Sequence, residues 1–289
     1  MSREIAIVGG GKVGTALGYL LSRKGFMITA VACRSGESAQ AAQAYTGGLA
    51  TTDVVEAARS ASIVFISTKD DQIEEVCCRI AQGGGFRSDG FVFHFSGALS
   101  LDCLNPAKES GAATGSIHPL QSFADVEDAI EHLPGSFFGV TAPKTVLDLA
   151  REVVDALGGR FLLIKEKDKP LYHAAACVVS NYLVALLHLG EEIMSAAGIS
   201  EQQAREAFWP LVAGTLENIR SKGTVRALTG PISRGDMGTL KMHLVELHAV
   251  LPRQSGVYNE LGRYTAEIAL KKGGIDRFQY ELLNQLFSK

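Results

Sequence analysis

The chain has few cysteines and no strong excess of charge of either sign. Its 289 residues include five cysteines, an odd number. They form no C-x-x-C pair and no spacing typical of metal ligands, so the sequence indicates free thiols in a reducing cytoplasm and no metal site. The net charge of −3 gives no electrostatic reason to expect nucleic acid or an anionic membrane as a partner.

Targeting and membrane-spanning segments are also lacking. No basic and apolar leader precedes the first apolar run, which begins within a few residues of Met1, so we expect no signal peptide. The segment from Leu171 to Leu189 is long and apolar enough to suggest a membrane span. Because it contains two histidines, a serine and an asparagine, a buried helix is the better interpretation.

The most informative pattern that is present lies in the first 35 residues. A strand-like run from Glu4 to Val8 precedes a G-x-G-x-x-G turn, a helical period and a second apolar run that ends at Ala32. In this motif Gly9 permits the tight turn, Gly11 lets the backbone approach a pyrophosphate, and Gly14 lets the helix pack closely on the strand. The N-terminus of the helix then offers N–H groups to phosphates, so the pattern predicts dinucleotide binding.

The end of the second strand indicates which dinucleotide binds. NAD sites place a carboxylate there for the ribose 2′-hydroxyl. In this chain the position is held by Cys33, followed by Arg34 and Ser35, and no carboxylate occurs before Glu37. A guanidinium with an adjacent hydroxyl suits the 2′-phosphate of NADP, whereas the alternative is an ordinary solvated arginine. We therefore expect NADP (NADPH).

Strand-like and helix-like segments alternate up to about residue 164. The later strand-like segments are 47–50, 63–67, 91–95, 116–118, 137–140 and 160–164, and the helix-like ones include 39–45, 53–59, 70–81 and 146–157. This alternation predicts an α/β fold with a parallel, doubly wound Rossmann sheet. The cofactor residues that we expect are Gly9, Gly11, Lys12, Val13, Gly14, Arg34, Ser35, Ser67 and Thr68.

From Asp168 onward, only helical periods remain. They cover roughly 170–197, 201–219, 236–250, 254–271 and 276–287. We therefore expect a dinucleotide-binding domain over 1–166 and a smaller all-α domain over 167–289. Helices this apolar often bury their surplus surface against a second copy, which makes a homodimer plausible.

Two strand ends carry candidate catalytic residues. Ser96 and Gly97 follow the fifth strand, and His118 ends the sixth, where Pro119 forces the chain to leave the sheet. Ligands of doubly wound sheets lie beyond the carboxyl ends of the strands. Ser96 can therefore orient a substrate or form a simple turn, and His118 can be catalytic or structural.

The helix expected at 170–197 has a narrow polar stripe on an otherwise apolar surface. At 100° per residue, His173, Cys177 and Asn181 fall on one side, and Lys169 extends the stripe backward. Such groups either find partners in the core or line a cleft. We name His173, Lys169 and Asn181 as catalytic candidates, with a purely structural stripe as the alternative.

A turn-rich loop between two later helices contains Thr229, Arg234 and Asp236. Arg234 can clamp a substrate carboxylate with two parallel hydrogen bonds, and Thr229 can add a hydroxyl. Alternatively, an Arg234–Asp236 ion pair holds the loop together. The loop is thus a candidate site for a small-molecule carboxylate.

Together these residues resemble a family that joins an N-terminal Rossmann-like NADP domain to a C-terminal helical dimerisation domain of long-unassigned function. The resemblance is carried by Val8 to Gly14, Phe95 to Ala98, Ile117 to Phe123, Leu171 to Tyr182 and Leu228 to Asp236. The architecture is similar to the 6-phosphogluconate dehydrogenase-like superfamily, which includes pyrroline-5-carboxylate reductases and ketopantoate reductases. Some relatives are thought to be alternative ketopantoate reductases, which implies that substrate here.

The catalytic residues of the superfamily cannot be carried over directly. β-Hydroxyacid dehydrogenases and familiar ketopantoate reductases have a Lys and, one turn later, an Asn on the first helix of the second domain. Here His173 stands one turn after Lys169, and Cys177 one turn after His173. We expect an NADPH-dependent reductase of a small 2-oxo acid, in which His173, Lys169 or His118 supplies the proton. An imine reductase and a non-catalytic NADP-binding sensor or scaffold are the alternatives.

Overall fold

The structure, a computed structural model, describes residues 3–288. The chain forms two compact units that divide after Ser180, which we call the sheet unit and the helical unit. The helix that begins at Lys169 therefore belongs to the sheet unit by its packing, whereas our sequence boundary at 166/167 had assigned it to the helical domain.

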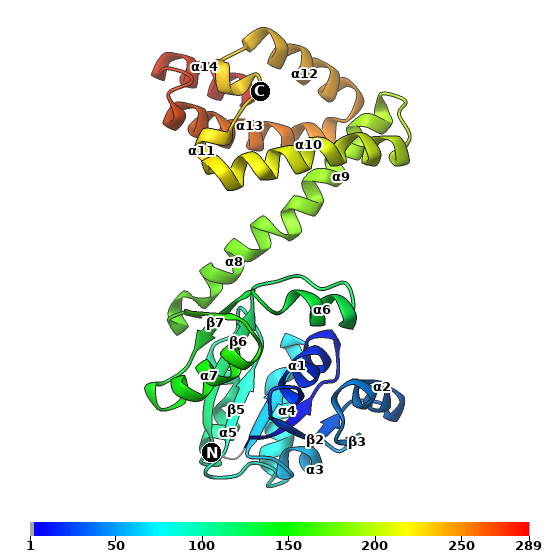
Figure 1. The fold of residues 1–289 in the computed structure, drawn as a ribbon. Coiled ribbons are helices and arrows are strands. Elements are labelled where there is room, and N and C mark those ends of the chain that lie inside the picture. The colour runs from blue at the N-terminus through cyan, green and yellow to red at the C-terminus, as the bar shows by residue number, and fades with distance from the viewer. Residues whose placement is uncertain (1–2, 289) are drawn as a thin grey trace. The chain divides into compact units, whose positions relative to one another are not determined.

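The sheet unit contains an eight-stranded sheet in the order β3-β2-β1-β4-β5-β6-β7-β8 (Figure 1). The strands are β1 (Glu4–Val8), β2 (Met27–Ala32), β3 (Leu49–Thr51), β4 (Ile63–Ile66), β5 (Phe91–His94), β6 (Ala113–Pro119), β7 (Phe137–Thr141) and β8 (Arg160–Leu163). The chain order reverses between β1 and β4, which is the point where such sheets bind their ligands. The predicted doubly wound α/β fold is confirmed.

Helices cover both faces of the sheet because successive strand residues point to opposite sides. The helices of this unit are α1 (Lys12–Ser22), α2 (Gly36–Thr46), α3 (Val54–Arg59), α4 (Asp70–Gln82), α5 (Asn105–Glu109), α6 (Val126–His132), α7 (Lys144–Ala156) and α8 (Lys169–Val179). Ile7 and Phe65 pack with α1 and α7 in one core. Val8 and Ile66 pack with α3 and α4 in the other.

One strand departs from the parallel arrangement. β7 runs antiparallel to β6 and parallel to β8, while the pairs from β3 to β6 are all parallel. A parallel return requires a crossover over a face of the sheet. Instead, the chain leaves β6 at Pro119 and passes through α6, which contacts α1, so β7 starts beside the end of β6.

The helix expected at 170–197 is interrupted. α8 ends at Val179, Ser180 has φ −110° and ψ −73°, and α9 (Asn181–Ala196) follows. Two β-branched residues and a serine at this point all lower helix propensity. The single helix expected at 170–197 is therefore two helices, and the role of Asn181 stays a prediction.

Within the single chain this segment is not buried, and its burial against a second copy stays a prediction. Leu171 is 77% exposed and Val179 is 72% exposed, and α9 has no buried residue. By length and composition, Glu166–Ala196 is the one stretch among residues 3–288 that could cross a membrane, and a single such stretch is weak evidence. Apolar composition predicts that a surface will be covered but not what covers it.

The helical unit has a small core. After α9 it contains α10 (Glu201–Lys222), α11 (Thr224–Ala227), the 3₁₀ helix η3 (Ile232–Arg234), α12 (Met237–Val250), α13 (Pro252–Lys272) and α14 (Arg277–Phe287). Its core is a cluster of buried hydrophobic residues from α12, α13, α14 and the turn before α14, namely Leu240, Ala266, Ala269, Ile275, Leu283 and Phe287. The helices predicted from Glu201 onward are confirmed to within a few residues.

The packing of α1 on β1 depends on Gly14. A Cβ built at Gly14 would lie 2.2 Å from the carbonyl oxygen of Gly9 and 2.3 Å from Ser67 Oγ, whereas a Cβ at Gly11 would meet nothing within 4 Å. Gly14→Ala should therefore lower the free energy of unfolding by about 1–3 kcal/mol. Gly11→Ala, the matched control, should change it by less than about 1 kcal/mol. Urea denaturation followed by circular dichroism measures both, and equal losses would contradict this account.

Candidate functional site

The carboxyl ends of β1, β2 and β4 form the first part of the site. Gly9 has φ 111°, which permits the turn, and a Cβ there would lie 2.7 Å from the carbonyl carbon of Ser67. Ser67 Oγ donates a hydrogen bond to the Gly9 carbonyl at 2.7 Å. The loop after β4 therefore holds the glycine-rich turn in place.

The N-terminus of α1 is open to a ligand. Gly11 is the N-cap residue and provides no side-chain cap, and no acidic residue occurs in the first turn. The side chain of Lys12 is exposed beside it. Backbone N–H groups, the helix dipole and a cation thus converge where the motif predicts a pyrophosphate.

The end of β2 combines a thiol, a guanidinium and a second helix N-terminus. Gly10 N donates to Cys33 Sγ at 3.2 Å, and burial raises the pKa of this thiol although the hydrogen bond opposes the change. Arg34 is exposed. Ser35 caps α2 by accepting from Ser38 N, so its hydroxyl is already engaged within the protein. The groups in this region that can bind an anion are therefore the Arg34 guanidinium and the N-terminus of α2.

One polar atom in this region lacks a partner. Thr68 Oγ1 is buried and makes no hydrogen bond within the described part of the chain. A buried hydroxyl without a partner is uncommon, and one beside a phosphate-binding turn points to a missing ligand. With the room around Gly11, this hydroxyl indicates that the residues fit a dinucleotide.

The second part of the site lies at the ends of β5 and β6. Ser96 Oγ donates to Asp70 Oδ2 at 2.6 Å and accepts from the backbone N–H groups of Ala98 and Leu99. Ser96 N donates to His94 Nδ1 at 3.2 Å. The hydroxyl that we expected to orient a substrate therefore holds the turn after β5, and a substrate contact stays a prediction.

Lys169 is buried beneath this turn, with 2% of its surface exposed. Its Nζ donates to the Ser96 carbonyl at 3.0 Å and to Ser116 Oγ at 2.7 Å. Desolvation by burial lowers its pKa to about 8. Pro170 in the first turn of α8 fixes where the helix begins, and so where this ammonium lies.

His118, Tyr172 and His173 meet above the same turn. His118 Nδ1 hydrogen-bonds Tyr172 Oη at 2.9 Å, and the two imidazole rings lie edge to face with centroids 5.7 Å apart. A Cβ built at Gly97 would lie 2.6 Å from His173 Nδ1 and 2.8 Å from His118 Nε2. The structure thus brings together Ser96, His118, Lys169 and His173, which the sequence had placed in two separate patterns.

The two histidines differ in environment. Burial, followed by the charges of His173 and Lys169, lowers the pKa of His118 to about 4, so His118 is neutral near pH 7. His173 Nδ1 is buried without a partner among residues 3–288, and its Nε2 lies 3.7 Å from Cys177 Sγ. An imidazole nitrogen without a partner is available to a reacting group.

Sequence reasoning missed Tyr172, Gly139 and Ser116. A Cβ at Gly139 would lie 2.6 Å from Tyr172 Oη, so only glycine lets the phenol reach His118. The spacing of Tyr172, three residues after Lys169, could have revealed it, because residues i and i+3 share a helix face. Gly139 pairs with His118 across β6 and β7, a register that the sequence does not show.

In the helical unit, Arg234 is paired. Its guanidinium donates to Asp236 Oδ2 at 3.1 Å, and Asp236 caps α12 by accepting from Thr239 N. This is the loop-stabilising alternative named from the sequence. Thr229 and Asn181 are exposed. The predicted roles of Arg234 and Thr229 in carboxylate binding, and of Asn181 in catalysis, stay predictions.

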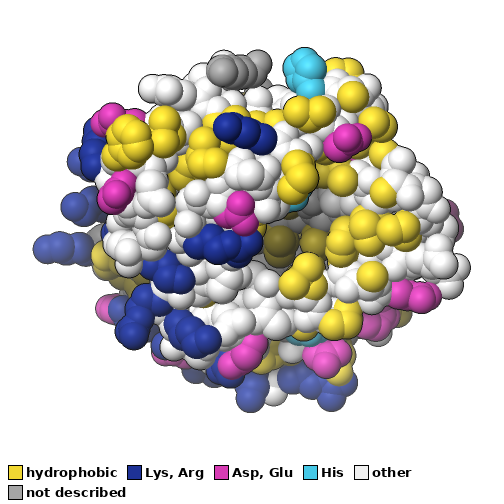
Figure 2. All heavy atoms as spheres, turned by 90° about the horizontal axis from the view of Figure 1, so that it is seen from above, with side chains coloured by type: hydrophobic (Ala, Val, Ile, Leu, Met, Phe, Trp, Pro, Cys, Tyr) yellow, Lys and Arg dark blue, Asp and Glu magenta, His cyan; other side chains and the backbone are white. Residues whose placement is uncertain are grey.

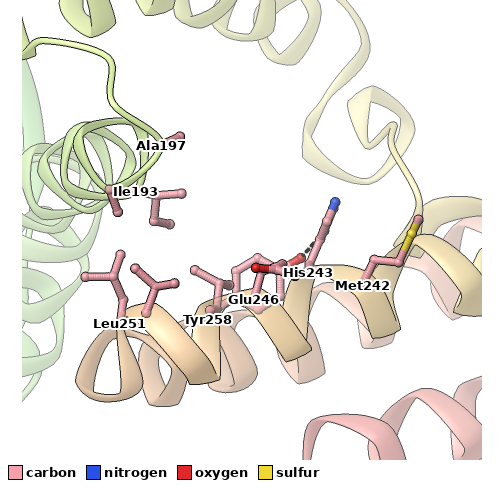
Figure 3. Close-up of a pocket in the computed structure, with 10 residues that line it drawn as sticks. Ile193, Ala197, Met242, His243, Glu246, Leu251 and Tyr258 are labelled. Atoms are coloured by element: carbon pink, nitrogen blue, oxygen red, sulfur yellow. Dashed lines mark hydrogen bonds between the residues drawn. The ribbon is translucent and has the colours of Figure 1, made fainter.

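The helical unit also contains an apolar pocket of about 560 Å³ (Figure 3). Ile193 of α9 and Ala197, just after α9, face Leu251 and α12 across it. At one side His243 Nδ1 hydrogen-bonds Tyr258 Oη at 2.9 Å. Among the described residues no group of His, Cys, Asp and Glu is placed to hold a metal ion. The pocket therefore offers hydrophobic surface rather than reactive groups.

Comparison with known proteins agrees with this geometry. Residues 2–119 match a family model described as a Rossmann-like domain, and residues 136–265 match the domain of unknown function DUF2520. No protein of curated function matches the chain in sequence.

Solved structures are similar over nearly the whole chain. A Bacteroides fragilis protein assigned as an NADP oxidoreductase is 23% identical, with a TM-score of 0.75 over 91% of this chain and 98% of its own. A Thermotoga maritima protein is 25% identical, with a TM-score of 0.74 over 93% and 99%. Pyrroline carboxylate reductase of Plasmodium falciparum, solved with NADP, is 15% identical, with a TM-score of 0.59 over 98% of each chain. The chain therefore joins a Rossmann-like domain to a DUF2520 domain and has the fold of NAD(P)-dependent reductases.

Proposed function

We propose that the protein is an NADPH-dependent reductase that reduces the carbonyl group of a small 2-oxo acid, with ketopantoate as the first candidate. The observation that supports this most is the pairing of two features in one unit. An open turn that suits phosphate lies at β1 and β4, and a cluster of two half-buried histidines, a half-buried tyrosine and a buried lysine lies at the ends of β5 and β6. The choice of a 2-oxo acid rests on the family resemblance.

The residues that would hold the cofactor are those of the open edge. The N–H groups at Gly11 and the cation of Lys12 suit the pyrophosphate, and Arg34 with the start of α2 suits the 2′-phosphate. Thr68 Oγ1 would gain its missing partner. When bound, the nicotinamide supplies a hydride to the substrate.

The protein must supply the matching proton. His173 has a buried nitrogen without a partner, so we assign it the transfer of a proton to the forming alkoxide. His118 is neutral and hydrogen-bonded to Tyr172. Its ring packs edge to face against the ring of His173 and so helps to orient it. Near pH 7, His118 is therefore a poor cationic acid and a good orienting group.

An imine is the second candidate substrate. The likeness to pyrroline carboxylate reductase covers 98% of both chains, and a C=N bond takes a hydride and a proton in the same way as C=O. A panel of 2-oxo acids and cyclic imines, followed by NADPH absorbance, separates the two. Binding of NADPH without turnover of any member would instead favour a sensor or scaffold.

We also propose a cytoplasmic homodimer. All five cysteines are free, as expected in a reducing compartment. In the helical unit, exposed large side chains include Val184, Trp209, Leu211, Met242, Val245 and Tyr264, each at least 63% exposed. Figure 2 shows hydrophobic side chains gathered round a hollow on the face seen from above. Monomers rarely expose so much apolar surface.

Light scattering should give twice the chain mass of 30.8 kDa, and a monomer would contradict the proposal.

The cofactor preference gives a direct test. NADPH should bind at least about ten-fold more tightly than NADH, because Arg34 can form charge-assisted bonds only to the 2′-phosphate. Arg34→Ala should remove most of this difference and leave NADH affinity nearly unchanged. Lys24→Ala, another exposed cation, is the control. Titration calorimetry measures all six affinities, and equal affinities in the parent protein would refute the assignment.

The proton step gives the second test. His173→Gln should keep the fold and NADPH affinity but lower kcat about 100-fold or more, because the proton donor is lost. His118→Gln should lower kcat less, because it alters only the orientation of its neighbours. If His118→Gln is the more damaging of the two, the roles are reversed.

A further inference from the structure

The buried ammonium of Lys169 is not explained by stability. Taking a charge out of water is unfavourable, and the lowered pKa of this group shows that burial opposes its charged form. No carboxylate lies within ion-pair distance of Nζ among the described residues. A methionine of similar length would fill the space without this penalty.

Its contacts instead fix one turn of backbone. Nζ bonds the Ser96 carbonyl directly, and Ser116 Oγ, which accepts from Nζ, lies 3.4 Å from the same carbonyl. The other polar groups of Ser96 are held by Asp70 and His94. Ser96 is thus restrained from every side, and Gly97, which follows it, lies against both imidazoles of the proton-transfer cluster.

Lys169 also influences the charges around it. Three neighbours oppose the lowering of the Lys169 pKa by burial. They are Cys103 of η1 (Leu101–Leu104), Asp70 of α4 and Glu166 of η2 (Glu166–Asp168). In turn its positive charge disfavours protonation of His94 and of His118. His118 is faced by Lys169, His173 and the hydroxyl of Tyr172. In this arrangement a second cation beside Lys169 is unfavourable.

We propose that Lys169 is a positioning residue: its ammonium fixes the Ser96–Gly97 turn against the two histidines and disfavours a second positive charge on His118, which favours His173 as the imidazole that exchanges a proton. This inference rests on the proposed reductase function. It differs from a direct role as proton donor, because Nζ already donates to two protein acceptors, whereas His173 Nδ1 has no partner among the described residues.

Four variants of the 289-residue chain separate these roles. Lys169→Met removes charge and contacts, Lys169→Arg restores the charge, and Ser116→Ala removes one contact while keeping the charge. Lys167→Met changes an exposed lysine in the preceding turn and is the matched control. For each variant, NMR titration of the His118 imidazole without cofactor or substrate, thermal stability and the dependence of kcat on pH are measured.

The parent and Lys167→Met should show His118 neutral from pH 5 to 7.5. In Lys169→Met, its titration midpoint should rise measurably above about 4 but stay well below 6.5, because burial, the largest cause of the lowered pKa, remains. The melting temperature should not fall, and kcat should fall about 10-fold to 100-fold. Lys169→Arg should restore the midpoint, and Ser116→Ala should lower kcat without moving it. Because Ser116→Ala and Lys169→Arg keep the buried charge, they remain informative if Lys169→Met does not fold.

Three outcomes would overturn the inference. An unchanged His118 midpoint in Lys169→Met would remove the electrostatic role. A lower melting temperature with normal kcat would show a structural role. Loss of turnover together with loss of the alkaline limb of the pH profile, at a constant His118 midpoint, would make Lys169 the proton donor. The titration needs no turnover, so failure of the proposed reaction and failure of this inference are distinguishable.

Discussion

The hydrogen bond from Lys169 Nζ to the Ser96 carbonyl links the first turn of α8 to the end of β5. A charged donor in a poorly solvated place makes a strong but demanding contact, because moving it leaves an uncompensated charge. This contact therefore holds the start of α8 against the sheet. It thereby also fixes the positions of Tyr172 and His173, which follow Lys169 in α8. The proton-transfer cluster has its geometry because this contact cannot easily be exchanged for water.

The sheet order brings the two parts of the site into one row. β1, β4, β5 and β6 are neighbours, so the glycine-rich turn, the loop with Thr68, the Ser96 turn and His118 follow one another along one edge. Shared contacts join them: Ser67 bonds Gly9, and Asp70, two residues after Thr68, bonds Ser96. A change in the loop after β4 therefore reaches both the phosphate-binding turn and the proton-transfer cluster.

The sequence predicted features that depend on local pattern. The glycine-rich turn, the strand ends and the polar face of α8 were all visible in spacing alone. The contacts of Ser116 with Lys169 and of Gly139 with Tyr172 were not, because they depend on strand register. The break at Ser180 was missed because apolar periodicity continues across it. Burial of the segment stays a prediction, because composition does not reveal which surfaces are covered only by a partner.

Gly97 and Gly139 have a consequence for how such a protein can diverge. Neither has a positive φ, so their backbones would accept other residues, and the restriction comes only from neighbouring rings. Gly97→Ala requires a smaller or displaced side chain in place of His118 or His173. Gly139→Ala likewise requires a smaller or displaced side chain in place of Tyr172. In homologous chains, substitutions at these positions should therefore occur as coupled pairs, and a lone alanine at either glycine would indicate that the cluster has been rearranged.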